Sequence, residues 1–301
     1  MVAVALQRAK GDDDPRSRLL VSTDWLAEKL NGDRRDLVLL HCTKESDCSD
    51  YRQRRIPSAV CFDLTLCRDN NSRYQNMLPS AGFFADYLTR LGVCNTDRVV
   101  VYDSYSDPNV NAACRVWAML RIFGHDNCSV LDGGLAQWVR EGRPLEGAKA
   151  VDKPPYVASF RPELVMDFGV VLANVKNEAG SPQMVDTRGA AVYSGEKPYM
   201  GLTQGHIRGV KNVPAPETLD AVTKRFKTND QLRQLYAERQ IDLSQPLIAS
   251  CGTGMTACAT IFAAALLGKE NVPLYDGSYF EFVNRAGGDY LETPAEPEQK
   301  Q

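Results

Sequence analysis

The sequence predicts an α/β protein made of two tandem copies of one domain, each a mostly parallel β-sheet flanked by helices. Three observations support this fold class. Short runs rich in Val, Ile and Leu, such as VVVY and PLIAS, do not alternate with polar residues. Such runs are typical of strands buried on both faces. Amphipathic stretches separate these runs, which indicates a parallel sheet covered by helices. Finally, the whole order of signals occurs twice.

The repeat can be followed along both halves of the chain. The first half contains VLLHC at 38–42, IPSAVCFD at 56–63, RVVVYD at 98–103, a helical run after Asn111, and SVLDGG at 129–134. The second contains MVDTR at 184–188, HIRGVKNVP at 206–214, PLIASC at 246–251, a helical run that stops at Gly268, and VPLYDGS at 272–278. Equivalent signals lie about 150 residues apart, which is too long for a solenoid and typical of a domain.

The repeat sets the expected domain boundaries. We expect a disordered tail over residues 1–17, a first domain over 18–145, a linker over 146–163, a second domain over 164–290 and a disordered tail over 291–301. The linker has no helical period and contains Pro154, Pro155 and Pro162. It is therefore expected to run extended from one domain to the other.

Composition narrows the classes of partner and cofactor. The chain is 44% hydrophobic and 24% charged, with a net charge of −3. This balance is typical of a soluble globular protein, and it argues against a nucleic-acid or membrane-surface partner. No apolar run is long enough to span a bilayer, and the N-terminus resembles neither a secretory signal nor a transit peptide. A cytoplasmic location is expected, with a mitochondrial one as the alternative.

Nine cysteines and three histidines bear on disulfides and metals. The cysteine count is odd, the spacing is irregular and no CxxC occurs. This pattern argues against a disulfide framework and against a zinc site, and it favours a reducing compartment. The histidines at 41, 125 and 206 are scattered, and we interpret each as structural. Neither a metal nor another cofactor is expected.

One cysteine lies in a loop suited to chemistry. In SCGTGMT, residues 250–256, two glycines lie between a predicted buried strand and a predicted helix. They allow the backbone to curl so that successive N–H groups point inward, as in an anion-binding nest. The helix start adds positive partial charge beside the sulfur, which favours the nucleophilic thiolate. We predict that Cys251 is the nucleophile. The residues predicted to cradle its sulfur are Gly252, Thr253, Gly254, Met255 and Thr256.

Alternatives to this interpretation were weighed. A cysteine at a strand end is usually inert packing, but a strand–Cys–Gly-x-Gly–helix arrangement is much less common. Cys258 lies two turns inside the predicted helix, so packing explains it better than a role as resolving cysteine. Cysteine phosphatases use C-x5-R, whereas the sixth residue after Cys251 is Ala257 and the loop holds no cation. Phosphate chemistry is therefore disfavoured.

The motifs together resemble the rhodanese superfamily, specifically the two-domain 3-mercaptopyruvate and thiosulfate sulfurtransferases. CGTGMTAC is similar to that family's CGSGVTA loop. DGGLAQW and YDGS resemble its second signature, and HIRG and RVWAMLRIFGH also match. The likeness covers roughly residues 18–290. It implies two rhodanese-like domains with only the second catalytic. Asp103 occupies the cysteine position of the first domain, which is therefore expected to be silent and to form one wall of an interdomain cleft.

The resemblance also implies a reaction and a set of partners. Sulfur passes from a small donor, 3-mercaptopyruvate or thiosulfate, to Cys251 as a persulfide, and then to a thiol acceptor such as thioredoxin, or to cyanide. The family's two substrate arginines align with Ala191-Val192-Tyr193 and with Pro198-Tyr199-Met200-Gly201, so both are replaced. A family triad of Asp, His and Ser maps to Thr65, Asn76 and Thr253. The residues nearby that could bind donor are Arg188, Lys197 and Tyr199.

Two hypotheses follow from these departures. The first is an active sulfurtransferase, and the intact loop favours it. The second is a persulfide-carrying or regulatory pseudoenzyme with weakened donor binding, which the replaced arginines favour.

Overall fold

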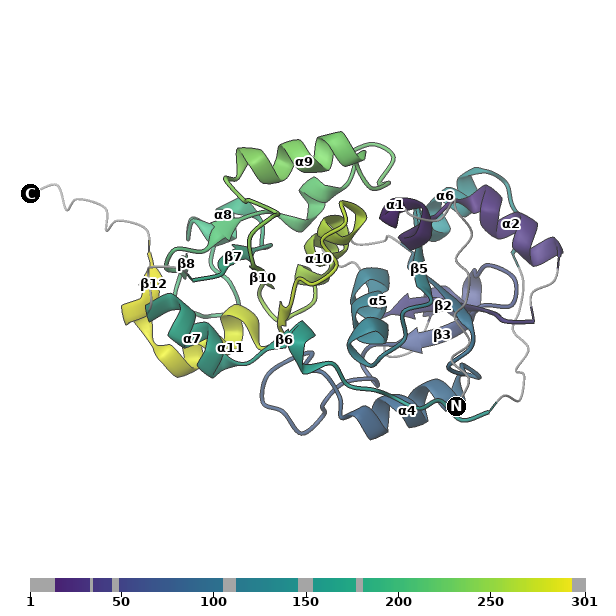
Figure 1. The fold of residues 1–301 in the computed structure, drawn as a ribbon, viewed down its shortest axis with the longest axis horizontal. Helices are drawn as coiled ribbons and strands as arrows, with labels where there is room; N and C mark the ends of the chain where they lie inside the picture. Colours follow the sequence, from purple (N-terminus) through teal and green to yellow (C-terminus); the bar gives the residue numbers. More distant parts are fainter. Residues whose placement is uncertain are drawn as a thin grey trace, which may run out of the picture.

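A computed structural model describes residues 14–32, 35–44, 49–104, 112–145, 154–176 and 181–293. Two five-stranded parallel sheets form the two halves of the molecule (Figure 1). The first has the order β1-β5-β4-β2-β3 and the second the order β6-β11-β10-β7-β9. In chain order the same connectivity therefore occurs twice, which is the repeat expected from the sequence.

The strands are short, as expected for buried parallel sheets. The first sheet consists of β1 (Leu20–Val21), β2 (Leu37–Thr43), β3 (Val60–Asp63), β4 (Arg98–Tyr102) and β5 (Cys128–Leu131). The second consists of β6 (Val165–Met166), β7 (Gln183–Asp186), β9 (Lys211–Asn212), β10 (Leu247–Ser250) and β11 (Leu274–Tyr275). A separate antiparallel pair joins β8 (His206–Ile207) to β12 (Leu291–Glu292).

Helices cover both faces of each sheet. In the first half these are α2 (Thr23–Asn31), α3 (Ser49–Gln53), α4 (Ala81–Arg90), α5 (Ala112–Ile122) and α6 (Gly134–Arg140). In the second half they are α7 (Phe168–Lys176), α8 (Ala190–Tyr193), α9 (Asn229–Glu238), α10 (Ala257–Leu266) and α11 (Ser278–Ala286). Three short 3₁₀ turns lie at Pro162–Leu164, Ala215–Thr218 and Gly288–Tyr290.

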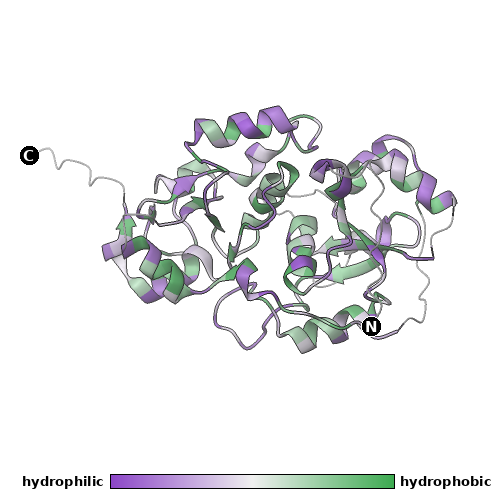
Figure 2. Ribbon diagram, viewed as in Figure 1, coloured by the Kyte–Doolittle hydropathy of each residue, from purple (hydrophilic) through white to green (hydrophobic). Residues whose placement is uncertain are grey.

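One hydrophobic cluster spans both halves, and each half has a smaller one of its own. Helices α5 and α10 follow equivalent strands and pack against each other in the middle of the molecule (Figure 1). Every residue of α10 is buried, and α10 is hydrophobic along most of its length, whereas α5 combines apolar residues with Arg115 and Arg121 (Figure 2). The Trp117 and Phe262 rings meet across this contact at 4.8 Å between centroids. Because α10 begins directly after the Cys251 loop, this contact fixes that loop relative to the first half.

The ends of the domains differ from expectation. Residues 15–17 belong to α1 (Pro15–Leu19), which Asp14 caps, so the tail expected over 1–17 extends too far. Helix α1 packs on α10, and the Arg16 guanidinium donates to the Lys227 carbonyl at 3.0 Å. At the other end, Leu291 and Glu292 form β12 rather than the start of a tail. Residues 1–13 and 294–301 lie outside the described part of the chain.

The linker runs along the first half before it enters the second sheet. Of the linker expected over 146–163, residues 154–161 have no helix or strand, and its last two residues belong to the 3₁₀ turn Pro162–Leu164. The Ser159 and Arg161 amides donate to the carbonyls of Phe123 and Ile122, at 2.9 and 2.8 Å. Val165 then begins β6, which pairs with β11. The sequence predicted this extended conformation. Hydrogen bonds to the first half hold the segment in it.

Candidate active site

The candidate nucleophile lies at the carboxyl edge of the second sheet. Strand β10 ends at Ser250, and α10 begins at Ala257. The intervening loop turns back on itself at Gly254, whose φ is +79°. A Cβ at this position would lie 2.6 Å from the Asp276 carbonyl oxygen, so glycine is required both for backbone conformation and for space. The sequence therefore folds here into the curled loop that its two glycines predict.

Ser278 organises the inside of this loop. Its hydroxyl accepts from the Cys251 and Gly254 amides, at 3.1 Å each, and lies 3.9 Å from the Cys251 sulfur. It also lies 2.7 Å from the Tyr275 carbonyl, so its one proton has two alternative acceptors. Ser278 is fully buried, with φ at +51°, which a non-glycine residue rarely adopts. The hydroxyl thus ties the start and the turn of the loop together beside the sulfur.

Other loop amides remain available to an anion. Within the described chain, four of them donate to no protein acceptor: Gly252, Thr253, Met255 and Thr256. They lie in the loop that leads from Cys251 to the start of α10, where amides without an acceptor can bind an anion. Of the five residues predicted to cradle the sulfur, Gly254 alone has its amide engaged, by the Ser278 hydroxyl.

Cys251 faces a cavity formed by both halves. The residue is only 1% exposed, yet it lines a cavity of about 530 Å³. The first half contributes Lys44, Gln75 and Asn76. The second half contributes Thr187, Arg188, Gly189, Val192, Lys197, Tyr199, Met200, Pro216, Cys251, Gly252, Thr253, Met255 and Thr256. The sulfur therefore lies at an interdomain cleft next to a helix start, and not within a purely apolar core.

An arginine from the first half holds the loop in place. Arg115, on α5, is 1% exposed and donates to the Gly254 carbonyl at 3.0 Å and to Asp276 Oδ1 at 2.8 Å. It also donates to the Asn76 carbonyl at 2.5 Å. Burial lowers the pKa of Arg115, but the Asp276 carboxylate more than offsets this and raises it above its usual value. The guanidinium stays charged and joins both halves at the Cys251 loop.

The residues of the family triad are only partly connected. Asn76 Nδ2 donates to Thr253 Oγ1 at 2.9 Å, so the contact between the halves persists at these positions. Thr65 instead donates to Asp63 Oδ1 at 2.7 Å. Because an amide does not relay protons as an imidazole does, this contact positions the loop without serving as a proton path.

The three predicted donor-binding residues all line the cavity, but they differ in burial and in how many partners they have. Arg188 is 5% exposed and donates to both oxygens of Asp186, at 2.8 and 2.6 Å to Oδ2, and to the Gly205 carbonyl at 3.0 Å. Its guanidinium also stacks 3.8 Å from the centroid of the Tyr279 ring. A buried arginine that pairs with a carboxylate and a backbone carbonyl serves first of all to hold the cavity wall together.

Lys197 and Tyr199 are more open to a ligand. Lys197 is exposed and forms no ion pair within the described residues. Tyr199 packs against Gly252 so closely that a Cβ there would overlap the phenol oxygen. Burial and the neighbouring Cys251 raise the pKa of Tyr199 to about 12, with Arg188 opposing the shift. The phenol is therefore neutral at physiological pH and can donate its O–H.

The replaced arginine positions also face the cavity. Val192 and Tyr199, the residues that align with the two family arginines, both line it, and neither carries a positive charge. This placement agrees with the alignment of the segment that precedes HIRG.

Three residues around the sulfur escaped the sequence analysis. Ser278 was assigned to a family signature without a role, and its buried hydroxyl could be anticipated only from the fold. Arg115 and Lys44 belong to the half expected to be silent, so no local signal connects them with Cys251. Their place at this cavity follows only from the packing of the two halves against each other.

The remaining candidates behave as structural groups. Burial raises the pKa of Cys258 to about 12, with Arg115 opposing, and its thiol points to the Gly254 carbonyl. His206 stacks on Tyr193 at 3.8 Å between centroids. His125 Nε2 lies 3.1 Å from the Asp97 carbonyl. No cluster of three potential metal ligands occurs among the described residues. One cysteine departs from expectation, because Cys61 is disulfide-bonded.

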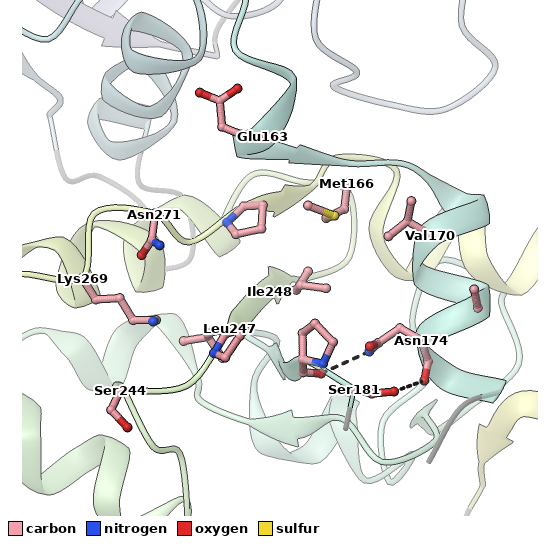
Figure 3. A pocket seen from close by; sticks show the side chains of 14 residues that line it. Glu163, Met166, Val170, Asn174, Ser181, Ser244, Leu247, Ile248, Lys269 and Asn271 are labelled. Carbon is pink, nitrogen blue, oxygen red and sulfur yellow. Dashed lines mark hydrogen bonds between the residues drawn. The ribbon is translucent and has the colours of Figure 1, made fainter. Parts of the chain in front are cut away.

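A larger cavity lies at the opposite end of the second sheet. It has a volume of about 680 Å³ and an apolar floor that includes Met166, Leu247 and Ile248 (Figure 3). Asn174 and Ser181 are linked across its edge by a hydrogen bond of 3.2 Å. The cavity lies at the amino ends of the strands, whereas ligands of open α/β sheets bind at the carboxyl ends. Its size alone does not make it the reactive site.

None of the helices within the described ranges is both long and apolar enough to cross a membrane.

Comparison with known proteins agrees with this geometry. A model of the rhodanese-like domain matches residues 22–141 and 171–285. The chain is 38% identical over 285 residues to 3-mercaptopyruvate sulfurtransferase of Rattus norvegicus, covering 91% of this chain and 95% of that protein. It is 40% identical over 282 residues to thiosulfate sulfurtransferase of Mus musculus, covering 89% and 93%. The crystal structure of SseA from Escherichia coli, one of the 3-mercaptopyruvate sulfotransferases, superposes with a TM-score of 0.76 at 33% identity, covering 87% and 99%.

Proposed function

Because this chain belongs to the rhodanese family of two-domain sulfurtransferases, we propose that it moves a sulfane sulfur atom from a small anionic donor to an acceptor through a persulfide on Cys251. Its relatives are sulfurtransferases, so the reaction class follows from the family. The persulfide, the donor and the acceptor are the proposed part.

The observation that supports the persulfide most strongly is the set of unengaged amides around the sulfur. Four loop N–H groups have no acceptor among the described residues, and they follow directly on Cys251. A persulfide ends in an anionic sulfur one bond beyond the cysteine sulfur. Oriented amide dipoles stabilise such a charge without a cation, as an oxyanion hole does. The neutral loop is therefore suited to hold the covalent intermediate.

The first half-reaction loads the enzyme. The Cys251 thiolate attacks the outer sulfur of thiosulfate, the S–S bond of the donor breaks, and sulfite leaves with the bonding electrons. With 3-mercaptopyruvate, the thiolate attacks the donor sulfur, the C–S bond breaks, and the thiol proton ends on carbon to give pyruvate. In both cases the enzyme gains one sulfur atom.

The second half-reaction unloads the persulfide. A thiolate or cyanide attacks the outer sulfur and regenerates the Cys251 thiolate. A thiol acceptor such as thioredoxin leaves with the sulfur as a persulfide, and cyanide leaves as thiocyanate. Because the same cavity serves both steps, ping-pong kinetics are expected.

The donor would bind between Cys251 and the exposed part of the cavity wall. Tyr199 offers a neutral hydroxyl next to Gly252, and Lys197 offers an unpaired positive charge at the rim. Arg188 has a structural role in the cavity wall, because its guanidinium is paired with Asp186.

The test is a paired measurement of loading and turnover. Purified protein is incubated with thiosulfate or 3-mercaptopyruvate, and intact-mass spectrometry records the addition of one sulfur atom. Turnover is followed as thiocyanate with cyanide, and as pyruvate with a thiol. Cys251→Ser should neither gain sulfur nor turn over, while Cys258→Ser should do both. Sulfur found on another cysteine would contradict the proposal. Loading without turnover would identify a persulfide carrier instead.

A further inference from the structure

The larger cavity of the second half, at the amino ends of its strands, is lined like a binding site for an apolar molecule. Its volume of about 680 Å³ lies within the usual range for small-molecule pockets, about 300–1,000 Å³. Met166, Leu247 and Ile248 form its floor, and Val170 lies at its side (Figure 3). No described residue that lines it is aromatic. The cavity thus offers aliphatic contacts and no ring for stacking.

A cation without a partner lies at one end of this cavity. Lys269 is half-buried and extends over the floor toward Leu247 (Figure 3). Its ammonium group forms neither an ion pair nor a hydrogen bond within the described chain. The nearby Asp242 carboxylate accepts instead from the Ser244 amide and hydroxyl, at 2.8 and 2.7 Å. Lys269 is therefore free to hold an anion at the cavity.

The other polar side chains narrow the choice of ligand. Asn271 lies beside Lys269 at the same end, and its side chain has no hydrogen-bond partner within the described residues (Figure 3). Glu163, the one acidic residue among the described residues of the lining, directs its carboxylate away from the floor (Figure 3). One end of a largely apolar cavity thus offers a positive charge and an amide.

This cavity is separate from the one that contains Cys251. Strand β10 connects them, because Leu247 and Ile248 contribute to the floor of the first and Cys251 follows the opposite end of the strand. No described residue lines both cavities. A molecule bound at the amino ends of the strands would therefore not compete with a sulfur donor for space.

We propose that this cavity is a binding site for an aliphatic monocarboxylate, independent of the proposed sulfur transfer. The hydrocarbon chain lies over Met166, Leu247 and Ile248, and the carboxylate pairs with Lys269 and accepts from the Asn271 amide. Other ligand classes fit the lining less well. A sugar or a nucleotide would place hydroxyls without partners against the apolar floor. An aliphatic amine would bring a like charge to Lys269.

The test measures the binding of three probes to the full chain by isothermal titration calorimetry. Octanoate and decanoate differ in chain length, and 1-octanol matches octanoate in length but lacks the charge. Lys269→Met removes the cation and keeps the length of its side chain. Lys197→Met makes the same change at the Cys251 cavity and serves as the matched control. Val170→Glu places a carboxylate at the wall, where the side chain is 48% exposed and the fold tolerates the change.

Decanoate should bind about tenfold more tightly than octanoate, because two more methylenes are buried. Lys269→Met should weaken both carboxylates about tenfold and leave 1-octanol unchanged, as expected for one lost charge-assisted hydrogen bond. Val170→Glu should weaken all three probes, and Lys197→Met none of them.

Three results would overturn the inference. The first is the absence of saturable carboxylate binding to the wild-type protein. The second is a loss in Lys197→Met as large as that in Lys269→Met, which would assign the binding to the Cys251 cavity. The third is a dimer in analytical ultracentrifugation that Val170→Glu dissociates, because a second copy of the chain would then cover the cavity.

Discussion

The two halves share one sheet topology but use the equivalent strand end in opposite ways. In the first half, the residue after β4 is Asp103, whose carboxylate accepts from the Ala113 amide at 3.0 Å. Ala113 lies in the first turn of α5, so a side chain of the protein occupies this helix start. In the second half, Cys251 has that position and loop amides remain unengaged. The difference is that an internal carboxylate occupies the helix start of the first half, whereas the described chain places no such acceptor on four amides of the Cys251 loop.

The aspartates of the two DG turns, by contrast, have the same role in both halves. Each accepts hydrogen bonds from the other half of the molecule. Asp132 accepts from Arg225 Nε at 2.7 Å and from the Phe226 amide at 3.1 Å, across the interface. Asp276 accepts from Arg115 at 2.8 Å and from the Leu78 amide at 2.6 Å, in the reverse direction. Only the second contact adjoins the reactive loop.

The largest effect is expected from breaking these two clamps separately. The Arg225 side chain is 49% exposed, whereas that of Arg115 is 1% exposed. Arg115→Met would leave Asp276 buried without its partner and should lower the free energy of unfolding by about 3–5 kcal/mol. Arg225→Met should cost about 1 kcal/mol or less. Urea unfolding of both variants measures the difference, and similar costs would show that the clamps are equivalent.

A second variant restores an arginine at one of the two positions where the resembling family binds the substrate carboxylate. Val192→Arg places a guanidinium in the cavity wall, where Val192 lies at a position that carries an arginine in the resembling family. We expect kcat/KM for 3-mercaptopyruvate to rise about tenfold, because a charge-assisted pair to the carboxylate is added. Steady-state kinetics with both donors provide the check. An unchanged value would mean that residue 192 does not face the donor.

A third variant, in the first half, tests whether the residue equivalent to Cys251 affects turnover. Asp103→Ala removes the carboxylate from the start of α5 and should destabilise the protein by about 1 kcal/mol, as loss of a helix cap does. Turnover of the remaining folded protein should be unchanged, because Asp103 is not among the residues that line the cavity. Thermal unfolding and activity are measured on the same sample. A selective loss of turnover would show that the first half is not silent.

The smallest effect concerns a histidine of the first half. Burial lowers the pKa of His125, although the Asp97 carbonyl opposes the shift. The unfolded chain, with an ordinary pKa near 6.5, then binds a proton more readily than the folded chain. Stability should be fully present above that pH and fall as pH drops below it. His125→Gln should flatten this part of the stability curve between about pH 7.5 and 5.5, while an unchanged slope would assign it to other groups.

The sequence was informative where local chemistry decides the structure. Apolar runs and glycines predicted the repeated strands, the loop at Cys251 and the end of α10 at Gly268, whose φ is +92°. It was less informative where distant segments meet. Arg115 contacts the Cys251 loop, and Lys44 lines the same cavity as that loop, each from more than a hundred residues away, and nothing near them in the chain indicates this. Arg188 could not be assigned from its motif alone, because its engagement depends on the burial of Asp186.

The apolar helix α10 also has a consequence for how the protein could be divided. Because all of its residues are covered, in part by α5 of the first half, separating the halves would expose apolar surface and would also break the buried Arg115–Asp276 pair. A protease cut within the linker would therefore yield a nicked complex and not two separate proteins. Expression of the catalytic half alone should give aggregates, since the separated surface is largely hydrocarbon. An ancestor with a single copy would have needed either a more polar version of this helix or a second copy of itself bound there.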